Sequence, residues 1–225
     1  MRDDVPLIDW DWVMGNLDQI WARLVQHVSL TLIAVAIGFA ISFGLALLVH
    51  RRRVLLGPLS SATATLYTIP SLALFALLWP ATGFNSELTA TTALVSYTLF
   101  ILLRNMVAGL DGVPDELRET ATALGYTRWQ RLWRVELPLA LPLIVAGVRV
   151  ATVTTVGLVT VAAIIGLGGL GALILSGLRS FSTFVTPLYV GAFLSLALAL
   201  LADVVLLTLQ RRLTPWAERR ASSRA

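Results

Sequence analysis

The sequence predicts an all-α integral membrane protein with about five transmembrane helices and one polar two-helix loop. Hydrophobic residues make up 57% of the chain and charged residues only 13%, whereas about a quarter of the residues in a soluble domain are charged. Five apolar stretches reach the length of about 20 residues that a helix needs to cross a bilayer. One long charged segment, 115–142, interrupts this apolar pattern.

The expected spans divide the chain into three parts. Residues 1–26 form an extracytoplasmic or interfacial segment, residues 27–209 the transmembrane domain, and residues 210–225 a cytoplasmic basic tail. The tryptophans of the first part favour a position at the membrane surface, where indole rings prefer to lie. The five spans are residues 27–49, 58–79, 88–108, 139–165 and 185–209.

The arginines set the expected orientation. All 17 basic residues are arginine, and basic residues concentrate in cytoplasmic loops. An outside N-terminus and an inside C-terminus leave Arg2, Arg23 and Arg179 outside the cell and Arg149 within a span. The same orientation places every other arginine in the cytoplasm: Arg51, Arg52, Arg53, Arg104, Arg118, Arg128, Arg131, Arg134, Arg211, Arg212, Arg219, Arg220 and Arg224.

The composition and the motifs argue against an enzyme. The chain has no cysteine for a thiolate site and no lysine for a Walker A phosphate loop. His27 and His50 lie at opposite ends of the first span, too far apart to share a metal ion, and we expect both at the membrane interface. Residues 166–171 match G-x-G-x-x-G but follow a transmembrane helix rather than a strand. We expect a flexible or tightly turning linker there, or a docking surface for a substrate-delivering partner.

The charged segment has the local signals of two short helices joined at a glycine. Pro114 suits a first helical position, and acidic residues follow it where the helix dipole favours them. Gly125 can adopt the left-handed conformation that ends a helix. Thr127 followed by Gln130 is the capping-box pattern that starts another. We therefore expect a helical hairpin on the cytoplasmic side.

A spaced motif in this segment resembles the EAA loop of ATP-binding-cassette importer permeases. It reads Glu119-Thr120-Ala121, then Gly125 after three residues, then Val135-x-Leu137-Pro138. The family pattern has alanine in place of Thr120 and isoleucine in place of Val135, and the spacing is the same. Three further stretches extend the likeness to permeases for glycine betaine, carnitine, choline and related osmoprotectants, namely 68–74, 103–105 and 166–171.

This resemblance implies a non-catalytic permease subunit in a bacterial cytoplasmic membrane. Loop 111–138 would couple the subunit to a separate ATPase dimer, which binds ATP-Mg, so no cofactor is expected in this chain. The implied partners are a second permease, identical or a sister chain, an extracytoplasmic binding protein and membrane lipid, with no nucleic acid. The implied solute is glycine betaine, choline, carnitine or proline betaine, with another small solute such as an amino acid as the alternative. The coupling residues would be Glu119, Thr120, Ala121, Gly125, Leu137 and Pro138.

Hydroxyl and aromatic side chains in the second and third spans are candidates for a polar translocation path. Thr63, Tyr67, Pro70 and Tyr97 belong to this group. Proline frees helix carbonyls and permits a bend, and tyrosine rings attract quaternary ammonium groups. The alternative is structural, because hydroxyls in a membrane usually bond to their own or a neighbouring helix.

Arg149 and Asp203 are the two charged residues placed within spans, and we expect them to pair. An unpaired charge at such depth costs about 2.5–3.5 kcal/mol on insertion scales. The alternative is that each faces a wet cavity, or reaches the interface, and contributes to the translocation path. An ion-coupled transporter would have to rely on these two charges alone, and it would leave the cytoplasmic loop without a purpose.

Overall fold

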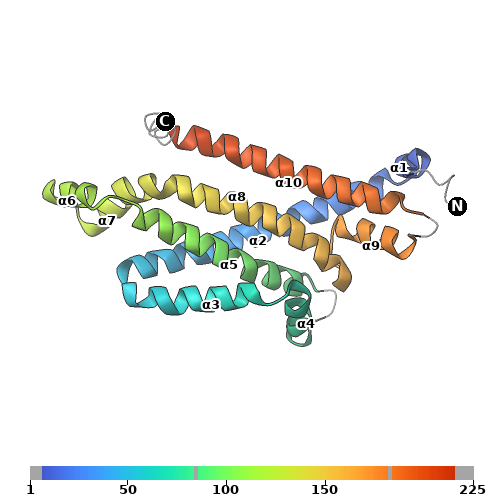
Figure 1. Ribbon diagram of the computed structural model, residues 1–225, viewed down its shortest axis with the longest axis horizontal. Coiled ribbons are helices and arrows are strands. Elements are labelled where there is room, and N and C mark those ends of the chain that lie inside the picture. Colours follow the sequence, from blue (N-terminus) through green and yellow to red (C-terminus); the bar gives the residue numbers. More distant parts are fainter. Residues whose placement is uncertain (1–6, 84–85, 182–183, 216–225) are drawn as a thin grey trace.

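The computed structural model describes residues 7–83, 86–181 and 184–215, and the regular structure of this part is helical, without a strand. The expected all-α class is therefore confirmed. The long and short helices follow one another along the chain as Figure 1 shows. They are α1 Trp10–Gly15, α2 Leu17–Arg51, α3 Leu56–Thr68, α4 Ser71–Thr82, α5 Glu87–Asp111, α6 Asp115–Ala123, α7 Arg128–Arg131, α8 Leu137–Ala162, α9 Gly171–Arg179 and α10 Thr186–Leu213.

Helix α5 forms the centre of the molecule. It packs most extensively against α8 and α2, while α3 and α4 cover one side and α10 lies beyond α8 on the other (Figure 1). Within the described residues, four helical stretches are long and apolar enough to cross a membrane, and the bent pair α3–α4 makes five if it counts as one span. The expected number of spans agrees with this arrangement.

The second expected span is bent rather than straight. Helices α3 and α4 meet at 99°, and the break falls at Ile69 and Pro70, which are both extended. Proline disfavours helical geometry in the residue before it, so Ile69 leaves the helix. The hydroxyl of Tyr97 on α5 donates to the freed carbonyl of Ile69. Sequence 58–79 therefore forms two helices in place of one.

Small residues let the long helices approach α5 closely. A Cβ atom at Gly38 of α2 would lie 1.9 Å from the Thr98 hydroxyl oxygen, and one at Gly147 of α8 would lie 2.5 Å from Asn105 Cβ. Thr98 and Asn105 both lie on α5. Close approach of backbones increases van der Waals contact, which is a main source of helix association in a membrane.

His27 is buried, which corrects the expectation that it lies at the interface. Its Nε2 donates to the Val156 carbonyl on α8 at 3.1 Å, and its Nδ1 accepts the Leu170 backbone N–H at 3.3 Å. His27 thus ties α2 to α8 and to the glycine-rich segment 166–171. This segment turns tightly, since Gly166 and Gly169 have φ values of 86° and 46°, and it leads into α9, which was not expected from the sequence.

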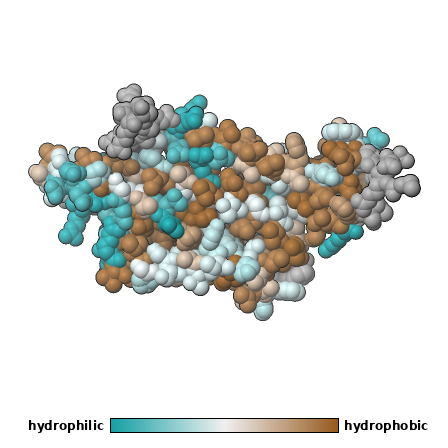
Figure 2. Space-filling model, in the orientation of Figure 1, coloured by the Kyte–Doolittle hydropathy of each residue, from teal (hydrophilic) through white to brown (hydrophobic). Residues whose placement is uncertain are grey.

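The two ends of the molecule differ in polarity. We call the end that carries Arg51, Arg52, Arg53, α6 and α7 the arginine-rich end. Figure 2 shows hydrophilic residues gathered at this end and a hydrophobic face over the long helices. Of the proposed domain parts, residues 1–6 and 216–225 lie outside the described residues, while α1 and the first turns of α2 account for most of segment 1–26.

The glycine-rich segment leads to a first prediction. A Cβ atom at Gly171 would lie 2.3 Å from the Thr160 carbonyl oxygen, so Gly171→Ala should lower the free energy of unfolding of the purified chain by about 1–3 kcal/mol through overpacking. Gly157→Ala is the control, because nothing lies within 4 Å of a Cβ atom there. Denaturant unfolding followed by circular dichroism measures both. Equal stability of the two variants would contradict the packing role of Gly171.

Candidate functional site

The first helix of the charged segment ends as its sequence predicts. Just after α6, Gly125 has a φ of 81°. Its N–H donates to the Thr122 carbonyl, and the Tyr126 N–H donates to the Ala121 carbonyl, each at 3.0 Å. These two bonds form a Schellman motif. Pro114 was expected at the first helical position, but it lies at the N-cap, one residue before the helix starts at Asp115.

The second short helix starts at the expected capping box but continues further than expected. The Thr127 side chain accepts from the Gln130 N–H, and the Gln130 side chain accepts from the Thr127 N–H. Helix α7 then passes through a π-helical turn, Leu132–Glu136, into α8. The helical path from Arg128 to Ile165 is therefore continuous over 38 residues, so the charged segment and the fourth span share one long helix.

A buried glutamate holds this region together. Glu136 has no exposed side-chain surface, and its Oε1 accepts a hydrogen bond from Arg131 Nε at 2.8 Å. His50 Nε2, at the end of α2, lies 3.1 Å from its Oε2, and Arg118 Nε on α6 lies 3.8 Å from the same oxygen. We call these four residues the glutamate hub. The position of His50 in the hub corrects the expectation that it is a simple interfacial residue.

Arg118 has further contacts that fix the base of α6. Its Nη2 donates to the Leu110 carbonyl near the end of α5 at 2.6 Å, and its Nη1 pairs with Asp115 at 2.8 Å. The hub therefore connects α2, α5, α6 and the start of α8. Sequence reasoning missed Glu136, although it is the unspecified residue of Val135-x-Leu137-Pro138 and the one acid among several arginines.

The residues of the EAA-like motif fall into two groups. Glu119 and Thr120 are exposed on α6, and Glu119 has no ion pair or hydrogen bond within the described part of the chain. Ala121 is buried beneath them, and Leu137 and Pro138 are half-buried at the start of α8. An open groove of about 410 Å³ runs beside Glu119 and includes Arg118, Thr122 and Arg131.

Four of the candidate path residues gather along α3 and α5. The Tyr67 ring lies 5.8 Å from the Tyr97 ring and 4.8 Å from the Phe100 ring, between centroids. Pro70 marks the break just beyond them, and the Tyr97 hydroxyl bonds to the carbonyl before it. Thr63 is buried and donates to the Leu59 carbonyl at 2.9 Å, so its hydroxyl is satisfied within its own helix.

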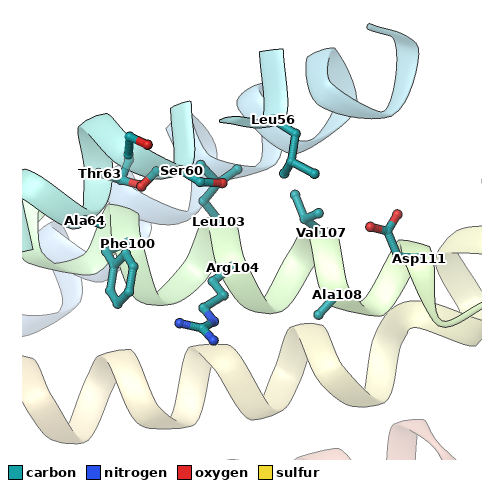
Figure 3. Close-up of a pocket in the computed structure, with 11 residues that line it drawn as sticks. Leu56, Ser60, Thr63, Ala64, Phe100, Leu103, Arg104, Val107, Ala108 and Asp111 are labelled. Carbon is teal, nitrogen blue, oxygen red and sulfur yellow. The ribbon is translucent and has the colours of Figure 1, made fainter. Parts of the chain in front are cut away.

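A pocket of about 550 Å³ lies beside this group (Figure 3). Ser60 and Thr63 of α3 line one side, and Phe100, Leu103 and Arg104 of α5 line the other. The Arg104 guanidinium lies 5.9 Å from the Phe100 ring centroid. The pocket is thus mostly apolar, with hydroxyls and one aromatic face accessible from within it.

Arg149 and Asp203 lie apart from that group, at the contact of α8 with α10, and they form the expected pair. Arg149 Nη2 lies 2.8 and 2.9 Å from the two Asp203 oxygens, and its Nε lies 3.0 Å from Oδ1. Gln210 extends the network, since it accepts from Arg149 at 3.3 Å and donates to the Pro142 carbonyl at 3.1 Å. The pairing expectation is confirmed, and Gln210 is an addition that the sequence did not indicate.

The comparison with protein families identifies the chain. Residues 25–215 match the family described as binding-protein-dependent transport system inner membrane component. The chain belongs to this family. It is the permease subunit of an ATP-binding-cassette importer and a multi-pass protein of the plasma membrane.

Named relatives and a solved structure are similar over most of the permease. It is 39% identical over 210 residues to the osmoprotectant import permease protein OsmW of Salmonella typhimurium, covering 91% of this chain and 96% of that one. It is 35% identical over 206 residues to the glycine betaine/carnitine/choline transport system permease protein OpuCB of Bacillus subtilis, covering 91% and 93%. The crystal structure of an amino acid ABC transporter with histidines has a TM-score of 0.77 at 18% identity, covering 91% and 99%, and supports the fold.

The Arg149–Asp203 pair leads to a second prediction. Arg149→Ala and Asp203→Ala should each destabilise the purified permease more than the double variant does, because each single change leaves an unpaired charge between two helices. We expect a coupling energy of about 0.5–3 kcal/mol, typical of residues in contact. Asp115→Ala combined with Arg149→Ala is the control pair and should be additive. Additive losses for Arg149 and Asp203 would show that the two charges act independently.

The glutamate hub leads to a third prediction. Glu136→Ala should lower the free energy of unfolding by about 3–5 kcal/mol, since it leaves two arginines beside each other without their buried counter-charge. Glu116→Ala on the exposed face of α6 should change it by about 0.5 kcal/mol or less. Hydrogen exchange of the α6 amides provides a local measurement and should accelerate in Glu136→Ala. Unchanged exchange and stability would contradict the connecting role of Glu136.

Proposed function

We propose that the permease carries an osmoprotectant of the quaternary ammonium type and is driven by a separate cytoplasmic ATPase that docks on α6. The identity of 35–39% to permeases named for osmoprotectants, glycine betaine, carnitine and choline supports the solute class. The functional unit would contain an ATPase dimer, a second permease and an extracytoplasmic binding protein. Because the chain belongs to the family of binding-protein-dependent transport components, we do not propose the alternative of an ion-coupled transporter.

The coupling role rests on how α6 is held. Its base is fixed by Arg118 in the glutamate hub, whereas Glu119 and Thr120 are exposed, and Glu119 has no partner among the described residues. A carboxylate without an internal partner gains most from a donor or a basic group on a docking surface. Gly125 keeps the turn after α6 narrow because its φ of 81° suits glycine.

The translocation path rests on the aromatic residues beside the bent span. The Tyr67 ring contacts both others, with its centroid 5.8 Å from that of Tyr97 and 4.8 Å from that of Phe100. Their faces offer the attraction that ring quadrupoles exert on a quaternary ammonium group, and Pro70 and Thr63 border the same region. The pairing of Arg149 with Asp203 instead supports an interhelical role for these two residues.

A fourth prediction tests the coupling role. Glu119→Ala should strongly reduce uptake of radiolabelled glycine betaine by the reconstituted transporter while ATP hydrolysis by the complex continues, or it should release the ATPase during purification. Glu116→Ala removes the same charge from the same helix and should leave uptake near the wild-type rate. A bulky residue at Gly125 should resemble Glu119→Ala.

The uptake assay tests the solute class and the coupling role of Glu119 separately. Full uptake by Glu119→Ala at normal expression would overturn the coupling role. Failure of the wild-type complex to transport glycine betaine, choline or carnitine, together with uptake of an amino acid, would overturn the solute class and leave the coupling role intact.

A further inference from the structure

A second cavity at the arginine-rich end has a different character from the groove beside α6. It measures about 670 Å³ and lies between the end of α2 and α7. Its polar lining consists of His50, Arg51, Arg52, Arg128, Trp129 and Arg131. We call it the arginine pocket. Arg131 also borders the groove beside α6, so the two cavities share this residue of the glutamate hub.

The arginine pocket has more positive charge than the chain neutralises. Arg131 is paired with Glu136, but Arg51, Arg52 and Arg128 have no acidic partner among the residues that the structure describes. Arg51 instead lies over the Trp129 ring, 5.4 Å from its centroid. Three arginines around one cavity repel each other, and an anion in the cavity would remove that cost. The pocket is therefore complementary to an anionic group.

Aromatic residues place this pocket at the level of lipid headgroups. A continuous series of ring contacts leads from the apolar part of α2 to the pocket: Phe39 to Phe43 at 6.0 Å, Phe43 to Trp133 at 6.2 Å and Trp133 to Trp129 at 5.6 Å, between centroids. Trp129 and Trp133 are 50% and 47% exposed. Exposed tryptophans at the ends of membrane spans mark the boundary between hydrocarbon and headgroups.

We propose that the arginine pocket binds the headgroup of an anionic phospholipid from the leaflet at this end of the permease. Arginine forks form charge-assisted, bidentate hydrogen bonds to phosphate oxygens, and basic pockets on the cytoplasmic side of membrane proteins bind anionic headgroups in this way. The Trp129 ring would lie against the glycerol region. An acidic segment of the ATPase is the competing occupant. The exposed Trp129 and Trp133 favour lipid, because tryptophan is enriched at the boundary between hydrocarbon and headgroups.

Lipid titration of the purified full-length permease in detergent tests this fifth prediction. Native mass spectrometry would follow binding of dioctanoyl phosphatidylglycerol, dioctanoyl phosphatidylcholine and inorganic phosphate. We expect phosphatidylglycerol to bind at least tenfold more tightly than the other two. Arg52→Gln and Arg128→Gln should each weaken it about fivefold, in line with the contribution of one basic residue beside an anionic membrane.

Two controls exclude general effects of charge and folding. Arg212→Gln removes one positive charge at the exposed end of α10 and should leave binding unchanged. Arg52→Lys keeps the charge and should retain most of the affinity. The circular dichroism melting curves of all variants should coincide with that of the wild type.

Several results would overturn the lipid site. These are equal affinity for phosphatidylglycerol and phosphatidylcholine, equal affinity for phosphatidylglycerol and inorganic phosphate, or the same affinity in Arg52→Gln, Arg128→Gln and Arg212→Gln. Absence of lipid binding combined with loss of the ATPase from the Arg52→Gln complex would identify the pocket as a protein-docking surface instead. The outcome does not depend on the solute or on the coupling role of Glu119.

Discussion

The buried carboxylate of Glu136 is the constraint on which the arginine-rich end depends. A carboxylate without exposed surface is stable only where cations and hydrogen-bond donors compensate its lost hydration. Three different segments surround the carboxylate: Arg131 on α7 donates to Oε1, while Arg118 on α6 and His50 at the end of α2 lie 3.8 and 3.1 Å from Oε2. The position of α6 is therefore determined at its base, and exposed Glu119 on the same helix has no ion pair or hydrogen bond among the described residues. This combination supports the proposal that α6 offers Glu119 to a docking partner.

The same region is mechanically continuous with the membrane domain. Helix α7, the π turn and α8 form one helical path, and α8 packs against α5 through Gly147 and against α10 through Arg149 and Asp203. Packed interfaces of this kind move as units because interiors have few voids to absorb a displacement. Under the proposed coupling role, a movement at the base of α6 would therefore reach α8, and from α8 the helices on both of its sides.

Features that depend on neighbouring residues, such as helix ends, can be predicted from the sequence. Features that depend on distant residues, such as the burial of one side chain, cannot. Gly125 and Thr127 end and start helices through bonds to residues a few positions away, so their roles follow from the local pattern. The Arg149 pair was predictable because the cost of an isolated charge in a membrane requires a partner, and Asp203 alone was available. The burial of His27 and Glu136 depends on segments far along the chain, such as Val156, which lies 129 positions from His27, and no local pattern reveals it.

The end of the EAA-like motif, Leu137-Pro138, acquires a physical role once Glu136 is taken into account. Pro138 has no N–H, so it cannot donate to the Arg134 carbonyl as an α-helical residue would. The chain instead widens into a π turn, in which the Leu137 N–H donates to the Leu132 carbonyl. A π turn inserts one extra residue and rotates the helix that follows it. Leu137 and Pro138 therefore fix the register that lets Glu136 face inward while Trp133 faces outward, and the hub and the tryptophan boundary arise from the same turn.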